Sequence, residues 1–193
     1  MGRLHLLCLR LIAVTLALGS SSARVEGHTL PISYLFVVTD VDYVHVELSF
    51  NPFELEIFSA VDTNKNGRLD PTEVRSQGDG ITRLLLQHLT VTVDGKKMTA
   101  ETAGISPEAD SHHAVLRAHY RVKAHGKAVA IESSLQKVTS SSHLTQVKFL
   151  SGGEQQLAQL DSQSGKATFK PAGPKPAAGK SAEKSHSTET ERP

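Results

Sequence analysis

The sequence predicts a mainly β protein: an immunoglobulin-like β-sandwich with one helix–loop–helix segment inserted between its early strands. Short segments that alternate apolar and polar side chains recur through residues 28–170, and turn signals separate them. One stretch, residues 51–89, departs from this period of two and carries helix start signals instead. The flanking residues 1–23 and 171–193 have compositions that do not suit a folded core.

The first two strands are expected to form an antiparallel hairpin. Residues 32–39 are rich in β-branched and aromatic side chains, and residues 40–42 interrupt them. Residues 43–50 then alternate strictly, with Val44, Val46 and Leu48 on one face and His45, Glu47 and Ser49 on the other.

Two helices are expected next. The sequence Asn51-Pro52-Phe53-Glu54 combines an N-cap, a proline at the first helical position and a capping glutamate. The segment 70–73, Asp-Pro-Thr-Glu, repeats this start signal. Glycines at 78 and 80 weaken the second helix by about 1 kcal/mol each, so we expect a kink there before the helix continues to Gln87.

The rest of the chain is expected to be strands, which brings the predicted total to seven to nine. Asp94-Gly95 is a strong hairpin turn between residues 89–93 and a partner strand at 96–105. The other predicted strands are 113–122, 128–133 and 144–150, with one or two more within 155–169.

Between the predicted helices lies a twelve-residue segment, residues 62–73, rich in oxygen-bearing side chains. Calcium is bound by six to eight oxygens, and a loop of this length supplies them from positions 1, 3, 5, 7, 9 and 12, with glycine at 6. Gly67 stands at the sixth position, where a left-handed turn is needed, and Leu69 is expected to point into the protein. The predicted ligands are Asp62, Asn64, Asn66, the backbone carbonyl of Arg68, Asp70 and Glu73.

This segment resembles the calcium loop of the EF-hand family, in the form found in exported bacterial proteins. The resemblance implies one bound Ca²⁺, with Glu73 giving both carboxylate oxygens. Only Asp62, Asp70 and Glu73 carry charge, which is typical of extracellular sites with dissociation constants of about 10⁻⁴ to 10⁻³ M. We therefore expect a structural ion rather than a cytosolic signal sensor.

The sequence shows no second EF-hand loop. Residues 161–165 begin like a calcium loop, but the third position is glutamine, the glycine comes one residue early and the twelfth position lacks a carboxylate. EF-hands usually pair through their eighth residues, so we expect the β-domain to cover Leu69 in place of a second loop.

Residues 1–23 are predicted to be a secretory signal peptide. Arg3 and Arg10 precede or open an apolar run too short to span a bilayer, and cleavage is expected after Ala23 or Gly27. The only cysteine, Cys8, lies inside this segment. The mature chain is therefore expected to be secreted or periplasmic, without a disulfide or a membrane span. Residues 171–193, rich in Pro, Ala, Lys, Gly and Ser, are expected to be disordered.

A copper-binding carrier is the first alternative. Cleavage after Gly27 would make His28 the first residue, whose amino group and imidazole chelate copper together. Further ligands could come from Asp110, His112, His113 and His143. The segment 28–34 and the following strands also resemble soluble domains of HupE/UreJ-type proteins over residues 27–50. That resemblance implies a periplasmic domain linked to metal transport. A second alternative is an adaptor that binds an unknown protein through a calcium-ordered surface.

Composition and motifs argue against other classes. A net charge of +1 gives no strong field toward nucleic acid or anionic membrane. Ser151-Gly152-Gly153 is not a nucleophile elbow, and the sequence has no phosphate-cradling loop or zinc-protease helix. We therefore predict that the protein is not an enzyme.

Overall fold

The structure is a computed structural model that describes residues 31–108, 112–124 and 126–171. The predicted signal peptide, His28 and the predicted tail beyond 171 lie outside this part of the chain. The elements in chain order are β1 (Ile32–Thr39), β2 (Tyr43–Phe50), η1 (Pro52–Glu54), α2 (Phe58–Val61), α3 (Pro71–Gln87), β3 (Leu89–Val93), β4 (Lys96–Lys97), β5 (Thr102–Pro107), β6 (Ala114–Arg121), β7 (Val129–Ser133), η2 (Leu135–Lys137), β8 (Leu144–Ser151), β9 (Glu154–Leu160) and β10 (Lys166–Phe169).

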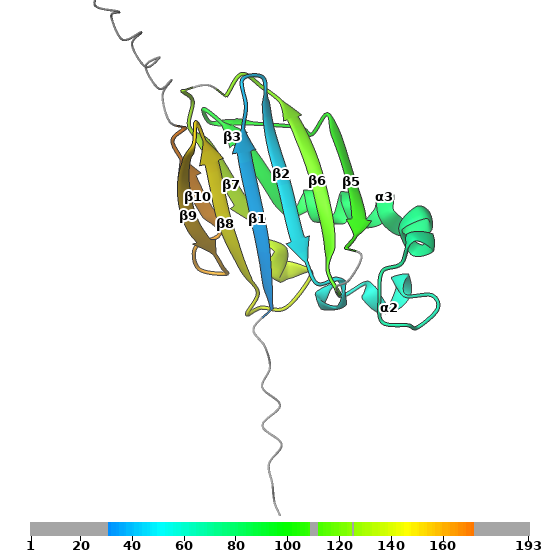
Figure 1. The fold of residues 1–193 in the computed structure, drawn as a ribbon. Coiled ribbons are helices and arrows are strands. Elements are labelled where there is room, and N and C mark those ends of the chain that lie inside the picture. The colour runs from blue at the N-terminus through cyan, green and yellow to red at the C-terminus, as the bar shows by residue number, and fades with distance from the viewer. Residues whose placement is uncertain (1–30, 109–111, 125, 172–193) are drawn as a thin grey trace, which may run out of the picture.

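The described chain is mainly β, as predicted, and its strands form two sheets (Figure 1). The larger sheet has the order β5-β6-β2-β1-β8-β9, and the smaller has the order β10-β7-β3-β4. All pairings are antiparallel except that of β1 with β8, which is parallel. No described helix is long and apolar enough to cross a membrane.

The two sheets lie one behind the other and share a hydrophobic core (Figure 1). Alternation along each strand places one set of side chains inward, such as Leu35 on β1 and Leu116 on β6, both fully buried. At the β8 end of the molecule, Phe149 from the larger sheet stacks on Phe169 from the smaller one. The ring centroids are 4.9 Å apart and the interplanar angle is 4°. These contacts join the sheets through side chains rather than backbone hydrogen bonds.

The local hairpin predictions are confirmed. β1 and β2 pair in the register Leu35↔Leu48, which turns both alternating apolar sets to the same side. The Asp94-Gly95 turn joins β3 to β4, and both residues have positive φ, 47° and 77°. A two-residue turn of this kind matches the right-handed twist of the strands.

The prediction of one continuous first helix is wrong, because the segment forms two short helices, η1 and α2. Asn51 does cap a turn, since its side chain accepts a hydrogen bond from the N–H of Phe53, but that turn is the short 3₁₀ helix η1. Leu55 follows with an extended backbone, ψ 130°, and its side chain is buried. The N–H of Glu56 then donates to the carbonyl of Val138, 3.0 Å away. Burial and this long-range hydrogen bond divide the segment, so that only α2 remains as an α-helix before the loop.

The expected kink in the second helix is also wrong. α3 runs unbroken from Pro71 to Gln87. Gly78 is buried against β5, and a Cβ atom there would lie 3.2 Å from the Cγ2 atom of Ile105. The glycine therefore lets the helix approach β5 closely, and this packing offsets the weak helical propensity of glycine.

The strand expected over residues 96–105 is two strands in different sheets. β4 covers only Lys96–Lys97 and pairs with β3, whereas β5 begins at Thr102 and pairs with β6. The chain therefore crosses from the smaller sheet to the larger one within the predicted strand. The crossing segment, residues 98–101, mixes apolar and polar side chains as a strand does, so local sequence alone does not distinguish it from strand.

Tyr120 in the core gives a prediction about alkaline pH. Its ring is buried on the inward face of β6, and burial raises the pKa of its hydroxyl from 10.0 to about 12. The unfolded tyrosine ionises first, so stability is retained below pH 10 and falls as the pH rises toward about 12. We expect the loss to reach about 2.7 kcal/mol, from 1.36 kcal/mol for each pH unit.

Urea unfolding at a series of pH values from 9 upward measures this effect, and Tyr120→Phe is the control. Lysines and the other tyrosines titrate in both proteins, so the difference between the two curves isolates Tyr120. Parallel curves for the wild type and the variant would contradict the prediction.

Candidate metal centre

The predicted ligand loop lies at one end of the larger sheet, between α2 and α3 (Figure 1). α3 packs along β5, and Gly78 and Ile105 make part of that contact. On the loop side, Leu69 and Asp70 line a surface hollow together with Pro107 and Glu108, which follow at the end of β5. The loop therefore lies between α3, which packs on β5, and the end of β5 itself.

The backbone of the loop bends at Gly67, as predicted. Gly67 has φ +72°, a left-handed conformation that L side chains rarely adopt. The ring of Phe53 also lies on this residue, because a Cβ atom at Gly67 would be 2.7 Å from the Cζ atom of Phe53. Phe53 packs in turn on Phe58, with ring centroids 4.4 Å apart. The segment before the loop thus covers the bend directly.

The side chains at the first, third and fifth positions fold back onto the loop. The Asp62 carboxylate accepts hydrogen bonds from the N–H groups of Asn66, at 3.0 Å, and Gly67, at 2.9 Å. The Asn64 carbonyl accepts from the N–H of Asn66 at 2.9 Å, and that of Asn66 accepts from the N–H of Arg68 at 2.8 Å. These bonds use only part of the accepting capacity of each oxygen and set the side chains around the loop.

Asp70 and Glu73, at the ninth and twelfth positions, also cap α3. The Asp70 carboxylate accepts from the N–H groups of Thr72 and Glu73, while the N–H of Asp70 donates to Glu73 at 3.1 Å. This is the reciprocal capping box that the sequence predicts. The hydrogen bond from the N–H of Glu73 is the main cause that lowers the pKa of Asp70. Because its pKa is lowered, this carboxylate stays ionised to a more acidic pH than an ordinary aspartate.

Glu73 also ties the two ends of the loop together. Its side chain is only 1% exposed, and its Oε1 atom accepts from the N–H of Thr63 at 2.8 Å and from the Thr63 hydroxyl at 3.2 Å. The N–H of Asn64 lies 3.4 Å from the same oxygen. The last residue of the loop is therefore bonded to residues near its beginning, which closes the loop on itself.

Leu69, at the eighth position, points inward as predicted. It is 4% exposed and belongs to the same hydrophobic cluster as the sheets. Arg68, at the seventh position, is a predicted ligand only through its backbone carbonyl. Leu69 is therefore part of the hydrophobic core and is not left exposed at the surface.

The donor set suits calcium by its chemistry. All six predicted positions supply oxygen, and the side chains of five of them are joined by hydrogen bonds within one loop. Across the described residues, no three His, Cys, Asp or Glu side chains are grouped so that they could hold a metal ion by themselves. The carboxylates of Asp62, Asp70 and Glu73 are therefore not grouped in this way, and the other predicted donors of the loop are the two asparagine side chains and the Arg68 carbonyl.

A buried polar cluster connects the residues before the loop to the larger sheet. His143 is 2% exposed; its Nε2 atom lies 3.0 Å from the Ser33 hydroxyl and its Nδ1 atom lies 3.2 Å from the Glu54 carboxylate. Serine, histidine and carboxylate in this order resemble a nucleophile triad. Ser33 is 0% exposed, however, so a substrate has no access to its hydroxyl in this arrangement. The cluster fastens η1 to the starts of β1 and β8.

The residues of the copper alternative are not brought together in the described chain. His28 and Asp110 lie outside it. His143 is buried, with its Nε2 atom within hydrogen-bond distance of Ser33; its Nδ1 atom lies 3.2 Å from the Glu54 carboxylate but does not form a hydrogen bond with it. His112 lies at the surface beside Phe53, with ring centroids 6.1 Å apart.

Sequence reasoning missed the contact between His45 and His119. Alternation places His45 on the polar face of the predicted strand 43–50, but that pattern does not identify a partner for its side chain. β2 and β6 pair in the register His45↔His119, and the two Nδ1 atoms lie 2.6 Å apart. Predicting this pair requires the register of β2 against β6. These strands are far apart in the sequence, and a single sequence does not give their register.

No protein-family model matches this chain, and a search of the curated proteins finds no match either.

Proposed function

We propose that residues 62–73 form an EF-hand loop that binds one Ca²⁺ and thereby fastens the helical segment to an immunoglobulin-like β-sandwich in an exported protein. The observation that carries the proposal is the coincidence of oxygen donors at six set positions with a left-handed Gly67 and a buried Leu69. In the bound state, Asp62, Asn64, Asn66, the Arg68 carbonyl, Asp70 and Glu73 would hold the ion.

In this proposal the ion has a structural role. Calcium would neutralise three carboxylates that otherwise repel one another within one loop. It would also hold Glu73 and Asp62 together, and with them the beginning of α3 and the end of α2. The ordered loop would then be connected to the β-domain by three contacts: those of Leu69, of Phe53 and of Glu54 with His143.

The expected stabilisation follows from mass action. With a dissociation constant of about 0.1 mM and free calcium of about 1 mM, bound calcium adds about 1.4 kcal/mol to the free energy of unfolding. For a domain of this size, that raises the melting temperature by a few degrees. Such an ion suits conditions outside the cytosol, where calcium remains high.

Thermal melts of the purified protein in millimolar calcium and in chelator test the proposal. We expect the calcium-dependent rise in melting temperature to disappear in Glu73→Gln, because an amide gives one neutral oxygen in place of a bidentate carboxylate. Asp79→Asn is the matched control, since it removes one exposed carboxylate from the same helix. A rise that is equal in all three proteins would place the calcium elsewhere, and no rise in the wild type would refute the proposal.

A calcium-dependent adaptor is the second candidate, and one observation favours it. Phe53 is 48% exposed although its ring lies on Gly67, and Ile57 beside α2 is also exposed. Apolar side chains next to the loop offer a surface whose position depends on the state of the loop. A partner bound to this surface would be released by chelator and by Glu73→Gln, whereas a structural ion alone would change only stability.

A further inference from the structure

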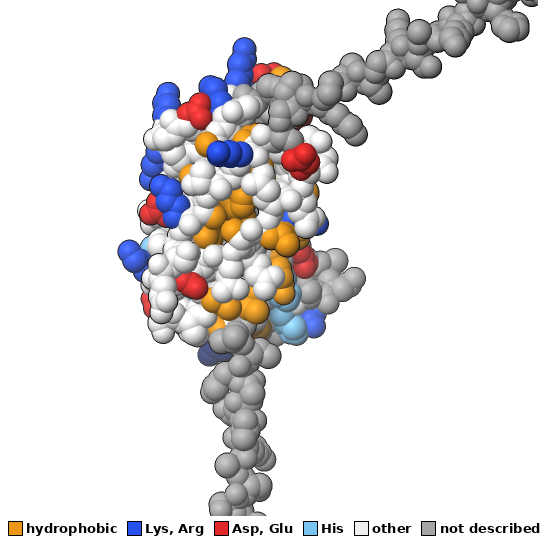
Figure 2. Space-filling view, turned by 90° about the vertical axis from the view of Figure 1, so that its left-hand side faces the viewer, with side chains coloured by type: hydrophobic (Ala, Val, Ile, Leu, Met, Phe, Trp, Pro, Cys, Tyr) orange, Lys and Arg blue, Asp and Glu red, His pale blue; other side chains and the backbone are white. Residues whose placement is uncertain are grey.

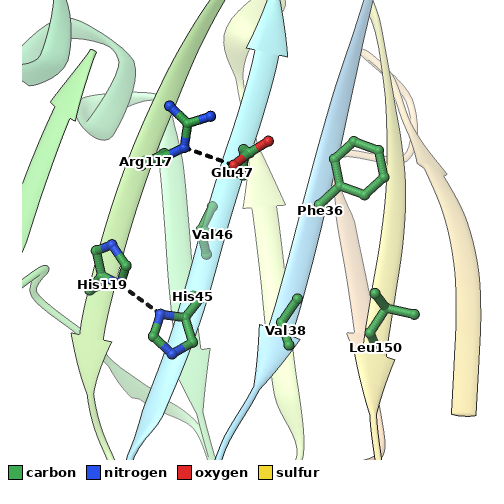
Figure 3. Close-up of a pocket in the computed structure, with 8 residues that line it drawn as sticks. All are labelled: Phe36, Val38, His45, Val46, Glu47, Arg117, His119 and Leu150. Atoms are coloured by element: carbon green, nitrogen blue, oxygen red, sulfur yellow. Dashed lines mark hydrogen bonds and ion pairs between the residues drawn. The ribbon is translucent and has the colours of Figure 1, made fainter. Parts of the chain in front are cut away.

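We propose a second metal site, distinct from the loop, in which His45 and His119 bind one divalent transition-metal ion such as Zn²⁺ or Cu²⁺. The two residues face each other across neighbouring antiparallel strands β2 and β6 on the outer side of the larger sheet (Figure 3). Their Nδ1 atoms are 2.6 Å apart, and the rings meet edge to face with centroids 4.8 Å apart at 80°. The site uses neither His28 nor the histidines at 112, 113 and 143.

The first argument for a metal site is the short contact between the Nδ1 atoms of His45 and His119. A neutral imidazole has one nitrogen that donates and one that accepts, so a single proton lies between the two Nδ1 atoms of His45 and His119. When that proton is transferred to Nε2 of the same ring, both rings stay neutral and both Nδ1 lone pairs are available to a metal ion. Neutral imidazole is a preferred ligand of zinc, copper and nickel, whereas calcium prefers oxygen.

The geometry needs only a small adjustment. With zinc–nitrogen bonds of about 2.0–2.1 Å and a tetrahedral angle, two imidazole nitrogens lie about 3.4 Å apart. The observed Nδ1–Nδ1 distance is 2.6 Å, so the rings must separate by less than one ångström. Both side chains are only partly buried, and the ring of His119 can move to make this adjustment, while the paired strands hold the two backbones in place.

The neighbouring charges permit a cation at this position. Arg117 beside the pair forms an ion pair with Glu47 at 2.9 Å, and Arg121 forms one with Glu101 at 3.0 Å. Each nearby guanidinium is thus balanced by a carboxylate. Tyr43 stacks on His45, with centroids 5.7 Å apart at 25°, and limits the movement of that ring.

One side of the site is apolar. The histidines, Glu47 and Arg117 line a groove of about 260 Å³ whose other wall comes from Phe36, Val38 and Leu150 (Figure 3). Phe36 and Val38 stand exposed on β1, next to β2 in the sheet. Seen from the β9 and β10 side, hydrophobic side chains cross the middle of the molecule, while Lys and Arg side chains gather mainly at the top and along the left-hand edge (Figure 2). An apolar wall beside the ion reduces its contact with water and strengthens its attraction to the ligands.

Two protein ligands leave the coordination of the ion open. In the described part of the chain, no third His, Cys, Asp or Glu completes a cluster that could hold a metal ion. Water or an added ligand in the groove would fill the remaining positions of a tetrahedral ion. The bound ion would therefore keep exchangeable ligands, unlike the closed four-ligand zinc centres that stabilise small domains.

Zinc titration of the full chain tests the proposal, with millimolar calcium present so that the loop does not contribute. We expect one zinc ion to bind, with its affinity lowered at least about tenfold by His45→Gln or His119→Gln, because even second-shell changes at metal sites cost 10–100-fold. The control is His112→Gln combined with His113→Gln, which should bind zinc like the wild type. Equal binding in all four proteins, or a loss only in the control, would overturn the proposal.

Nitrogen NMR of the imidazole rings in the wild type gives a second readout that does not depend on the folding of a variant. One equivalent of zinc should shift the Nδ1 signals of His45 and His119 together and leave those of buried His143 unchanged. Shifts confined to other histidines, or no shift at all, would refute the site.

Discussion

Glu73→Ala is expected to lower the free energy of unfolding by about 2–4 kcal/mol even without calcium, because it removes the acceptor of three part-buried hydrogen bonds, and a hydrogen bond typically contributes about 0.5–1.5 kcal/mol, or more when one partner is charged. Glu73 is almost fully buried and accepts hydrogen bonds from the N–H groups of Thr63 and Asp70 and from the Thr63 hydroxyl. Alanine offers no acceptor, so the loop opens and the first turn of α3 loses its capping box. Urea unfolding in chelator measures the change directly.

Glu73→Gln separates this architectural role from the proposed ion. Glutamine keeps one carbonyl oxygen for the donors of the loop, so its loss of stability in chelator should be clearly smaller than that of alanine. In calcium, both variants should lack the additional stabilisation expected of the wild type. If alanine and glutamine proved equally stable in chelator, Glu73 would not hold the loop through hydrogen bonds.

Phe149→Ala is expected to have the larger effect, a loss of about 3–5 kcal/mol, as is usual for a buried phenylalanine that leaves a cavity. Phe149 is 0% exposed on β8 and stacks on Phe169 of β10. The substitution therefore removes a contact between the two sheets as well as buried apolar area. Chemical denaturation at neutral pH measures the loss.

Leu157→Ala on neighbouring β9 is the matched control. Leu157 is 69% exposed, and a surface substitution of this kind usually changes stability by less than about 0.5 kcal/mol. A loss at Phe149 as small as that at Leu157 would mean that the two sheets do not depend on the stacked rings.

The features that the sequence predicts well are local ones. The hairpin of β1 and β2 and the Asp94-Gly95 turn each depend on patterns within a few neighbouring residues. The candidate loop is similar, because its six donor positions and Gly67 lie within twelve consecutive residues. These segments depend on residues that are close together in the sequence, so a single sequence is enough to propose them.

The features that the sequence does not predict depend on partners far along the chain. Leu55 breaks the expected helix because the fold buries it, and Gly78 does not kink α3 because Ile105 packs against it. The same holds for His45 and His119, which the alternating pattern places on outward faces without giving the register that joins them. Each outcome is set by tertiary contacts that outweigh local propensity.

The parallel pairing of β1 with β8 has a consequence for how the chain reaches its fold. Ile32 pairs with Leu144, and β1 lies between β2 and β8 inside the larger sheet. The centre of that sheet thus remains incomplete until nearly all of the described chain has been synthesised. Contacts so distant in sequence slow folding, typically to milliseconds or seconds for β-rich domains. Until β8 arrives, one edge of β1 stays open to pairing with other chains, so rapid docking of β8 is the step that protects the nascent protein from aggregation.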